Sequence, residues 1–318
     1  MITIGEKSVR RLLDEKTAFR LAREAFELVW LKKTRMPPKI YLELPGKPRG
    51  DFRAMPAFLE TRKGRVCGVK WVSVFPANPY RHLPTVNGTI LLNSPLTGEL
   101  LALLEGNTIT AMRTAAAAAV AAKFMAGPRP RKLALVGAGL QADYQLRALV
   151  NVYGLNEIHV WGHQPGEAKA FCRRFAPLHR NLKPVPDIKS CVSGADLIVT
   201  CTPSRRPLVK KAWLKPGVHI NAIGADAKGK EELDPAILRG AKVVVDEWEQ
   251  ASHSGEINVP VSKGLFSRRD LYAELAEIVG GKKKGRIRAD DTTVFDSTGL
   301  AILDIYFARY VYDAYKRF

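Results

Sequence analysis

A glycine-rich turn directly after an apolar stretch is the feature that most constrains the fold of this chain. Residues 132–136 (KLALV) are followed by Gly137, Gly139 and Ala142 in a G-x-G-x-x-A pattern that opens a helix. In this context the first glycine permits a tight turn, the second lets the backbone approach a pyrophosphate, and the alanine allows close packing of the helix. The helix N-terminus then faces the anion. The pattern predicts a dinucleotide-binding turn, whereas an isolated match would indicate only a strand-to-helix connection.

The chain after this turn alternates short apolar stretches with helical segments. Unalternating stretches such as 196–200 (DLIVT) and 242–245 (KVVV) are typical of strands buried on both faces of a parallel sheet. The helical segments between them supply the crossover connections. We therefore predict an α/β fold class with a Rossmann dinucleotide-binding domain. The contents of 46% hydrophobic and 25% charged residues are those of a globular protein and exclude a disordered chain.

The residues before the turn predict a domain of mixed helices and antiparallel strands. Asp14 can cap a helix that runs to about Trp30, because apolar residues recur there at intervals of three and four. Short apolar stretches separated by proline and glycine over residues 40–104 predict an antiparallel sheet. A helix from about Ile109 to Met125 follows.

The chain is expected to form two domains. The segment 127–131 (GPRPR) marks the boundary, so we assign residues 1–126 to the α+β domain and residues 127–297 to the Rossmann domain. The segment 298–318 contains an apolar-faced helix that we expect to pack back on the first domain. The Rossmann domain would then be an insertion.

The charge balance is strongly basic. Lys and Arg number 50 against 31 Asp and Glu, which gives a formal net charge of +19 and attracts anions in general. A basic cluster lies at residues 282–288, but no recognition-helix, RNP-type or zinc-finger motif accompanies it. We therefore predict no nucleic-acid partner, and we interpret the cluster as a solvated loop.

Cysteine usage and hydropathy indicate a cytoplasmic protein. The cysteines are scattered without zinc-ligand spacing, so neither a disulfide framework nor a metal site is predicted; they are Cys67, Cys172, Cys191 and Cys201. The N-terminus lacks the apolar core of a signal peptide, and no run of about 18 apolar residues occurs. We therefore expect no membrane partner.

The end of the second strand of the Rossmann domain bears on the choice of cofactor. An Asp or Glu about 20 residues after the glycines accepts the ribose hydroxyls of NAD in many such folds. Residues 160–164 (VWGHQ) contain no carboxylate, while His163, Lys169 and Arg173 place positive charge nearby. The sequence therefore favours NADP, and NAD stays open because neutral residues can also bind it.

Three charged residues stand out as candidates for chemistry. Lys70 lies within an apolar strand, where a lysine is costly unless an anion or a carboxylate meets it. Arg113 lies on a helix of small residues and can fork onto a carboxylate or phosphate. Asp226 follows an apolar strand at the end where open α/β sheets bind ligands. Taken singly, each also fits a structural role: a lysine at a half-exposed sheet, an arginine at a packed seam, an aspartate in a turn.

Taken together, these motifs show that the chain resembles the ornithine cyclodeaminase and mu-crystallin family, and most closely its alanine dehydrogenase-like and ketimine reductase members. The resemblance covers nearly the whole chain, with these stretches in the expected order: MPPKIYLELP, DFRAMPAF, GVKWVSVFPANP, ITAMRTAAAAAVAAK, LVGAGLQA, NAIGADAKGKEELD and DSTG. It implies a substrate and dimerisation domain, completed by the C-terminal helix, beside a Rossmann domain, and it implies a homodimer.

The resemblance also implies residue roles. The lysine that contacts the substrate carboxylate corresponds to Lys70, and the aspartate thought to exchange a proton with the substrate nitrogen or water corresponds to Asp226. These are the catalytic candidates. The other substrate-binding candidates are Lys39, Arg53, Arg113 and Thr298. The cofactor-binding candidates, including the glycine turn, are Arg113, Thr114, Gly137, Gly139, Leu140, Gln141, His163, Thr202, Ile223, Lys230 and Ser297.

One departure from true ornithine cyclodeaminases concerns the substrate. Those enzymes carry a glutamate two residues before the methionine of this motif, where it can hold the distal ammonium of ornithine, and this chain has Arg53. Two like charges about 4 Å apart cost on the order of 4 kcal/mol at an effective dielectric constant of about 20. Ornithine is therefore disfavoured, although Glu60 or Glu105 could compensate.

The sequence thus predicts an NAD(P)-dependent oxidoreductase that acts on the Cα–N bond of a small amino or imino acid. Alanine-like substrates or cyclic ketimines fit this prediction. Two alternatives stay open: an ornithine cyclodeaminase that recycles NAD internally, and a mu-crystallin-like NADPH-dependent binding protein with little turnover.

Overall fold

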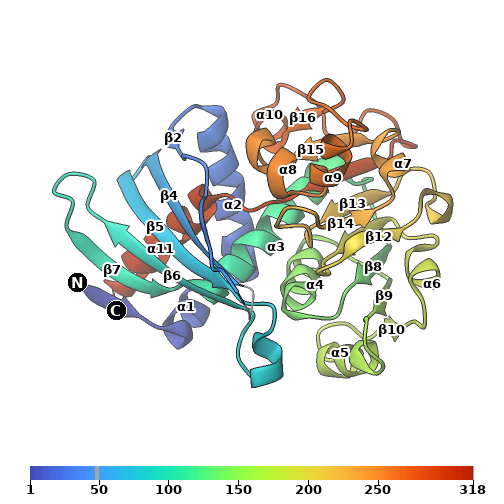
Figure 1. Cartoon of the computed structure of the whole chain (residues 1–318), viewed down its shortest axis with the longest axis horizontal. Helices are drawn as coiled ribbons and strands as arrows, with labels where there is room; N and C mark the ends of the chain where they lie inside the picture. The colour runs from blue at the N-terminus through green and yellow to red at the C-terminus, as the bar shows by residue number, and fades with distance from the viewer. Residues whose placement is uncertain (47–49, 318) are drawn as a thin grey trace. The chain divides into compact units, whose positions relative to one another are not determined.

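The chain forms two compact units. The computed structural model describes residues 1–46 and 50–317 (Figure 1). The first unit comprises Met1–Arg113 and the C-terminal segment from Leu300, and the second comprises Thr114–Gly299. The second unit is therefore inserted between two segments of the first.

The division falls inside helix α3 (Gly106–Met125). The backbone carbonyls in the later part of this alanine-rich helix accept hydrogen bonds from side chains of the second unit. Asn221 Nδ2 donates to the carbonyl of Ala118 at 3.2 Å, and Thr293 Oγ1 donates to that of Met125 at 3.0 Å. These bonds explain why this part of the helix belongs to the second unit.

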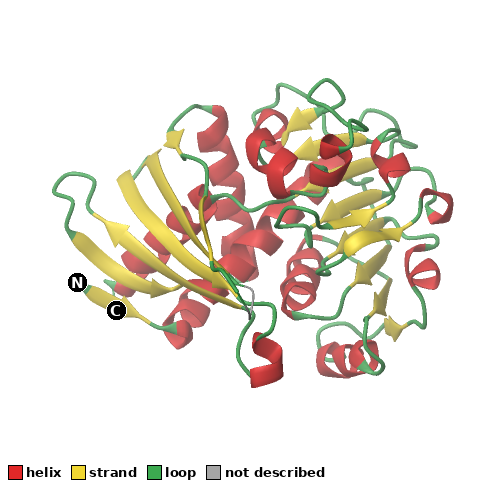
Figure 2. Ribbon diagram, in the orientation of Figure 1, coloured by secondary structure: helices red, strands yellow, loops and turns green. Residues whose placement is uncertain are grey.

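The first unit is built on a mixed sheet, whose strands are yellow in Figure 2. The strand order is β1-β7-β6-β5-β4-β2, and β3 pairs with β4. All pairings are antiparallel except that of β1 with β7. The predicted antiparallel sheet is confirmed. The strands are β1 (Ile2–Ile4), β2 (Thr34–Arg35), β3 (Ile40–Glu43), β4 (Asp51–Thr61), β5 (Gly64–Val74), β6 (Val86–Asn93) and β7 (Leu100–Glu105).

Helix α11 (Ala301–Tyr315) packs against strands β4, β5 and β6, and α2 (Glu15–Trp30) packs against α11 (Figure 1). The predicted cap of α2 is confirmed, because the Asp14 carboxylate accepts the Thr17 N–H at 2.7 Å. Helix α1 (Glu6–Leu12) and the 3₁₀ turn η1 (Asn78–Arg81) complete this unit, and neither was predicted.

The face of the sheet that carries α11 is closely packed. Alternate residues of β4 and β5 are buried, and Met55, Lys70 and Ile90 stand opposite one another on neighbouring strands. A Cβ at Gly68 would lie 3.0 Å from the Ile305 side chain of α11. The Leu91 carbonyl of β6 lies closer still to that position, so Gly68 leaves room for both the neighbouring strand and the helix, and Lys70 lies on the face that α11 covers.

The second unit is built on a parallel sheet with the order β10-β9-β8-β11-β13-β17-β15-β16. The predicted parallel sheet is confirmed. The strands are β8 (Lys132–Val136), β9 (Glu157–Trp161), β10 (Leu182–Pro184), β11 (Leu197–Thr200), β13 (His219–Ala222), β15 (Lys242–Val245), β16 (Ala273–Glu274) and β17 (Thr293–Asp296). A small parallel pair, β12 (Arg205–Val209) and β14 (Glu231–Leu233), lies outside this sheet.

Helices connect these strands and cover the apolar residues of the sheet. The central strands β11 and β13 are buried at every position, as their unalternating sequence predicts. The helices are α4 (Leu140–Val152), α5 (Glu167–Phe175), α6 (Ile188–Val192), α7 (Pro235–Leu238), α8 (Trp248–Ser254), α9 (Asn258–Ser262) and α10 (Leu275–Val279), with a 3₁₀ turn η2 (Lys211–Trp213).

Helix α3 begins one turn earlier than predicted. Its first residue is Gly106 rather than a residue near Ile109. The Glu105 carboxylate accepts the N–H of Asn107 at 2.6 Å and that of Thr108 at 3.1 Å, so it satisfies amides that an uncapped helix end would expose. Within residues 1–46 and 50–317, no helix is long and apolar enough to cross a membrane.

Candidate active site

The carboxyl ends of four neighbouring strands gather the predicted cofactor residues of the second unit. Strands β8, β11, β13 and β17 lie side by side, and Val136, Thr200, Ala222 and Asp296 stand in register at their ends. Four of the predicted residues follow these strands within one or two positions: Gly137, Thr202, Ile223 and Ser297. Open α/β sheets bind their ligands at this edge.

Gly137 is required by its own backbone conformation and by its neighbour. Its φ of +123° is strained for other residues, and a Cβ there would lie 2.9 Å from Cys201 Sγ. Its N–H donates to the Trp161 carbonyl at 2.9 Å. The glycine turn is therefore tied to the end of β9.

Gly139 leaves the N-terminus of α4 open. A Cβ on Gly139 would meet none of the described atoms within 4 Å, and within the described residues no side chain caps this helix end. Leu140 is 60% exposed, and the buried Gln141 Oε1 has no hydrogen-bond partner in the described part of the chain. A helix end with open space and available amides fits a pyrophosphate.

Substitutions at the two glycines should separate folding from binding. In Gly137→Ala the alanine would have to adopt a strained positive φ, and its methyl group would clash with Cys201. We therefore expect the free energy of unfolding to fall by about 1 to 3 kcal/mol. Gly139→Ala should leave unfolding unchanged, but its methyl group enters the space that the pyrophosphate needs and should raise the dinucleotide Kd about tenfold. Thermal unfolding and calorimetric titration measure both. Unchanged affinity in Gly139→Ala would contradict the assigned role of the turn.

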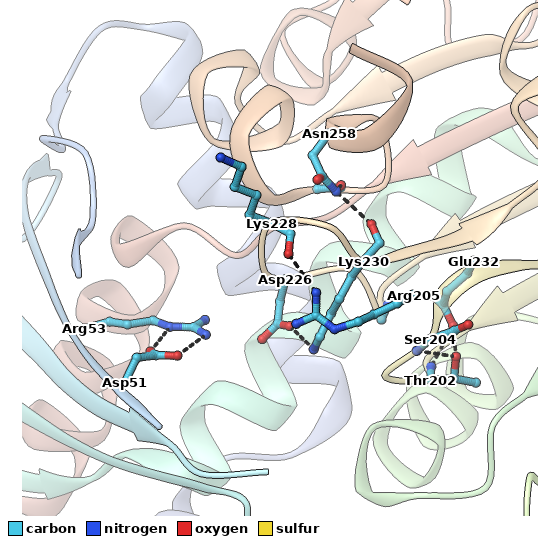
Figure 3. Close-up of polar contacts among 12 residues, drawn as sticks. Asp51, Arg53, Thr202, Ser204, Arg205, Asp226, Lys228, Lys230, Glu232 and Asn258 are labelled. Atoms are coloured by element: carbon cyan, nitrogen blue, oxygen red, sulfur yellow. Dashed lines mark hydrogen bonds and ion pairs between the residues drawn. The ribbon is translucent and has the colours of Figure 1, made fainter. Parts of the chain in front are cut away.

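A buried carboxylate joins the loops that follow β11 and β13. Glu232 Oε1 accepts both the N–H and the hydroxyl of Thr202 at 2.7 Å, and its Oε2 accepts the Gly224 N–H at 2.9 Å (Figure 3). Burial raises the pKa of Glu232, although these hydrogen bonds oppose the shift. Glu232 was not among the predicted site residues, because it is one of two adjacent acidic residues in the stretch KGKEELD, which shows no periodicity.

Asp226 lies on the loop after β13 and contacts Lys230. The Lys230 ammonium is 2.5 Å from Asp226 Oδ1, and the Asp226 side chain is 37% exposed (Figure 3). Asn258 holds this loop from both sides, because its Oδ1 accepts the Gly229 N–H at 2.8 Å and its Nδ2 donates to the Lys230 carbonyl at 2.7 Å. The loop therefore presents a partly exposed carboxylate in a fixed position.

Thr298 is fixed by the buried aspartate Asp246. Its N–H and its hydroxyl both donate to Asp246 at 2.7 Å, and the Gly299 N–H does so at the same distance. Nearby, burial and the charge of Asp246 raise the pKa of Asp296 to about 8. Asp246 directly follows β15 and was not among the predicted site residues.

The first unit holds a buried group of charges beneath α11. Lys70 Nζ lies 2.8 Å from Asp304 Oδ2, and Arg113 Nε lies 3.0 Å from Asp304 Oδ1. The side chains of Lys70 and Arg113 are 2% and 6% exposed, and that of Asp304 is fully buried. Lys70 is therefore buried and does not lie at a half-exposed sheet. The carboxylate partner that the sequence analysis expected for it is Asp304 of the last helix.

The charges in this group shift one another's protonation. Burial lowers the pKa of Lys70 to about 7; Asp304 opposes this shift, and the positive charge of Arg113 adds to it. Burial disfavours the ionised form of Asp304, but Arg113 and Lys70 outweigh burial and hold its pKa below the usual value. Lys70 can thus change its protonation state near neutral pH.

Two more of the predicted basic residues belong to the same surroundings. Lys39 contributes to the lowered pKa of Lys70 through its charge. Arg53 lies on the same buried face of the sheet as Lys70, and its guanidinium forks onto Asp51 at 2.6 and 3.2 Å (Figure 3) and lies 5.3 Å from the centre of the Tyr41 ring. Together with Lys70 and Arg113, these two residues make four cations. The carboxylates that they contact are Asp51 and Asp304, so positive charge is in excess, which suits an anionic ligand.

Asp304 was missed by the sequence analysis although it carries a recognisable signal. It is an aspartate within the apolar helix stretch AILDIYF. A buried carboxylate needs a paired cation, so an acidic residue on an apolar helix face indicates a partner elsewhere in the fold. The sequence alone could not show that the partners are Lys70 and Arg113.

Two predicted cofactor residues of the second unit do not follow these four strand ends. His163 is exposed beyond the end of β9, with its ring centre 6.2 Å from that of Trp161. Thr114 is buried on α3 and is the first residue of this unit.

Comparison with known proteins places this arrangement in a family. The sequence profile of the Ornithine cyclodeaminase/mu-crystallin family matches residues 5–317. The chain belongs to this family. The resemblance inferred from the motifs is thereby confirmed.

Similar family members include enzymes with solved structures. Alanine dehydrogenase of Archaeoglobus fulgidus is 42% identical over 98% of this chain and 94% of that protein. The structure of an archaeal alanine dehydrogenase dimer with bound NAD has a TM-score of 0.95 at 41% identity, covering 100% of this chain and 96% of the other. That of Thermococcus litoralis Δ1-pyrroline-2-carboxylate reductase with NADH and L-proline has 0.96 at 34% identity, covering 100% and 98%.

These relatives confirm two predictions at the level of the family. The α/β fold class with a Rossmann domain is confirmed by the structural matches over the whole chain. The prediction of a nicotinamide-dependent oxidoreductase also agrees with the relatives, which are a dehydrogenase and a reductase with bound NAD or NADH.

Proposed function

We propose that this chain is a nicotinamide-dependent oxidoreductase that acts on the Cα–N bond of a small amino or imino acid. The observation that carries the proposal is the buried group of Lys70, Arg113 and Asp304, which leaves net positive charge for a carboxylate. The glycine turn of the second unit supports it by offering an open helix end for the dinucleotide. Alanine dehydrogenase and Δ1-pyrroline-2-carboxylate reductase, both similar to this chain, act on such substrates.

In this proposal the first unit binds the substrate through its cations. Arg113 and Lys70 bind the substrate carboxylate, and Lys39 and Arg53 add positive charge around it. Asp304 keeps Arg113 and Lys70 in place, so the two donors are already oriented when the substrate arrives. Thr298 is assigned to the substrate as well, on a backbone that Asp246 fixes.

The second unit binds the dinucleotide and moves a proton. The amides after Gly139 bind the pyrophosphate, and Thr202, Ile223 and Ser297 lie at the strand ends beside the turn. The nicotinamide, when bound, accepts or donates the hydride at Cα. Asp226 exchanges the proton of the substrate nitrogen, and Lys230 orients its carboxylate.

A cyclodeaminase activity toward ornithine is the second candidate within this family. It would need a carboxylate for the distal ammonium of ornithine. Arg53 stands in the position discussed above, and the nearby Asp51 is engaged by its guanidinium. The geometry therefore favours substrates without a second ammonium.

Absorbance of the reduced nicotinamide tests the proposal. NADH or NADPH is mixed with the enzyme and either pyruvate plus ammonia or five- or six-membered cyclic imino acids. Ornithine is tested with NAD⁺, because its cyclodeamination begins with hydride transfer to the oxidised cofactor. We expect the reduced nicotinamide to be oxidised, and its absorbance to fall, with an imino acid or with pyruvate plus ammonia. Ammonia and proline released from ornithine without a net absorbance change would indicate a cyclodeaminase. Binding without any turnover would indicate a mu-crystallin-like ligand-binding protein.

The affinity for carboxylates should depend on the protonation of Lys70. Its pKa is lowered to about 7, so the ammonium form that binds an anion is present below that pH and is lost above it. The Kd of an unreactive carboxylate such as isobutyrate should rise by up to about tenfold per pH unit above pH 7. Lys70→Arg keeps its charge and should flatten this profile. Equal profiles for both proteins would contradict the role of Lys70.

We also propose a homodimer formed through the first unit. Apolar side chains on the sheet face opposite α11 are partly exposed, and Trp71 is 41% exposed. The others are Phe58, Val69, Leu91 and Leu103. The similar archaeal alanine dehydrogenase is a dimer. Light scattering should give twice the mass of 35.2 kDa, and Trp71→Asp should lower it, whereas Leu31→Asp on the end of α2 should not.

The substrate is a small metabolite and the cysteines are free, so we assign the enzyme to the cytoplasm.

Either NAD or NADP fits the proposed function. The prediction of NADP depended on the lack of a carboxylate in the residues that directly follow the second strand.

A further inference from the structure

The structure places a carboxylate at the end of β9, although the residue that carries it does not directly follow this strand in the sequence. Gly162 directly follows this strand and has no side chain. A Cβ at Gly162 would lie 2.7 Å from Glu167 Cβ and 3.0 Å from Glu167 Oε2, so the glutamate occupies the space that a side chain there would fill. Glu167 is the first residue of α5, and its Oε2 accepts the Gln164 N–H at 3.0 Å.

The end of β9 lies beside the glycine turn. The Gly137 N–H donates to the Trp161 carbonyl at 2.9 Å, and Trp161 is the residue before Gly162. The end of the second strand is where Rossmann folds meet the adenosine ribose. Glu167 therefore supplies, from the following helix, the acidic group that other chains carry on the strand itself.

Two of the three groups that favoured NADP in the sequence lie on another face of α5, whereas His163 is exposed directly beyond the end of β9. At 3.6 residues per turn, Lys169 and Arg173 are rotated by about 200° and 240° from Glu167 around the helix axis. Arg174 is closer in rotation, but it lies two turns away and contacts Asp143 at 3.3 Å. Helix α5 therefore turns the carboxylate of Glu167 toward the end of β9, and Lys169 and Arg173 away from it.

We propose that Glu167 makes this enzyme select NAD over NADP. Its carboxylate would accept the ribose hydroxyls of NAD and repel the 2′-phosphate of NADP. This inference rests on the proposed function, because it assumes that a nicotinamide dinucleotide binds at the glycine turn. It replaces the earlier preference for NADP, whose premise was that no carboxylate stands at this position.

Calorimetric titration of the full chain with NAD⁺ and with NADP⁺ at low ionic strength tests the proposal. We expect NAD⁺ to bind at least about tenfold more tightly, because the exposed carboxylate opposes a doubly charged phosphate. Glu167→Gln keeps the size and the bond to Gln164 but removes the charge, so it should bring the two Kd values to within about threefold. The matched control is Glu157→Gln at the start of the same strand, where Glu157 contacts Lys183 at 2.6 Å; it should keep the wild-type ratio.

The possible outcomes separate this inference from the proposed function. Equal or tighter binding of NADP⁺ by the wild type, or an unchanged ratio in Glu167→Gln, overturns the role of Glu167 while dinucleotide binding itself stands. Binding of neither dinucleotide overturns both. The ratio of kcat/KM for NADH and NADPH, measured with a substrate that is turned over, should follow the ratio of affinities.

Discussion

Asp226→Asn is expected to lower kcat by about 10² to 10⁴ while the dinucleotide still binds, because the amide cannot exchange the proton of the substrate nitrogen. The substitution keeps the size of the side chain. The loop should also keep its position, since Asn258 holds it through backbone groups of Gly229 and Lys230 rather than through the carboxylate. Steady-state kinetics with saturating dinucleotide and calorimetric titration measure the two effects separately.

The matched control for this variant is Asp187→Asn. Asp187 caps helix α6 in the same unit by accepting the Ser190 N–H at 2.8 Å, and asparagine caps helices about as well as aspartate. This control should keep normal turnover. Near-normal kcat in Asp226→Asn would remove Asp226 from the chemistry, and loss of dinucleotide binding would show that the carboxylate has a structural role instead.

Asp304→Asn should destabilise the protein by about 3 to 5 kcal/mol. The change leaves Lys70 and Arg113 buried without the carboxylate that both of them contact, and an unpaired buried charge is costly. We expect the Tm to fall by on the order of 10 °C, measured by calorimetry or circular dichroism. Adding Lys70→Met removes one of the two uncompensated cations, so the double variant should recover part of the loss.

The same helix provides a control for Asp304. Asp313 on α11 contacts Arg309 at 2.8 Å in a partly exposed pair four residues apart. Such pairs contribute only about 0.3 to 0.5 kcal/mol, so Asp313→Asn should hardly change the Tm. Similar Tm values for the two variants would show that Asp304 is not the electrostatic centre of the first unit.

The predictability of the site differed between its parts. The glycine turn and the strands beside it follow from local sequence: Gly137 is needed for its own φ, and apolar runs such as 197–200 form buried strands. The short pair β12 and β14 was not predicted, because segments of three to five residues with charged positions carry little periodicity. That pair contains Glu232, so the carboxylate that fixes Thr202 was missed with it.

The substrate residues were found by a different route. Lys70 is recognisable as a candidate because a lysine in an apolar strand needs a partner. The family resemblance then assigns it a role. The partner is Asp304, 234 positions along the chain by the numbering. Pattern analysis within a window of one helix or strand contains no information about such a pair.

The sequence by itself determined the main alternation of strands and helices, the dinucleotide turn and the basic character of the chain, because these depend on local periodicity, on the backbone freedom of glycine and on composition. Only the tertiary structure decided which charges meet. Asp304 reaches Lys70 because α11 packs on the face of the sheet that carries Lys70, and Glu167 reaches the end of β9 because Gly162 leaves room for it. Burial and Coulomb energies depend on distances in space, and separation along the chain does not set those distances.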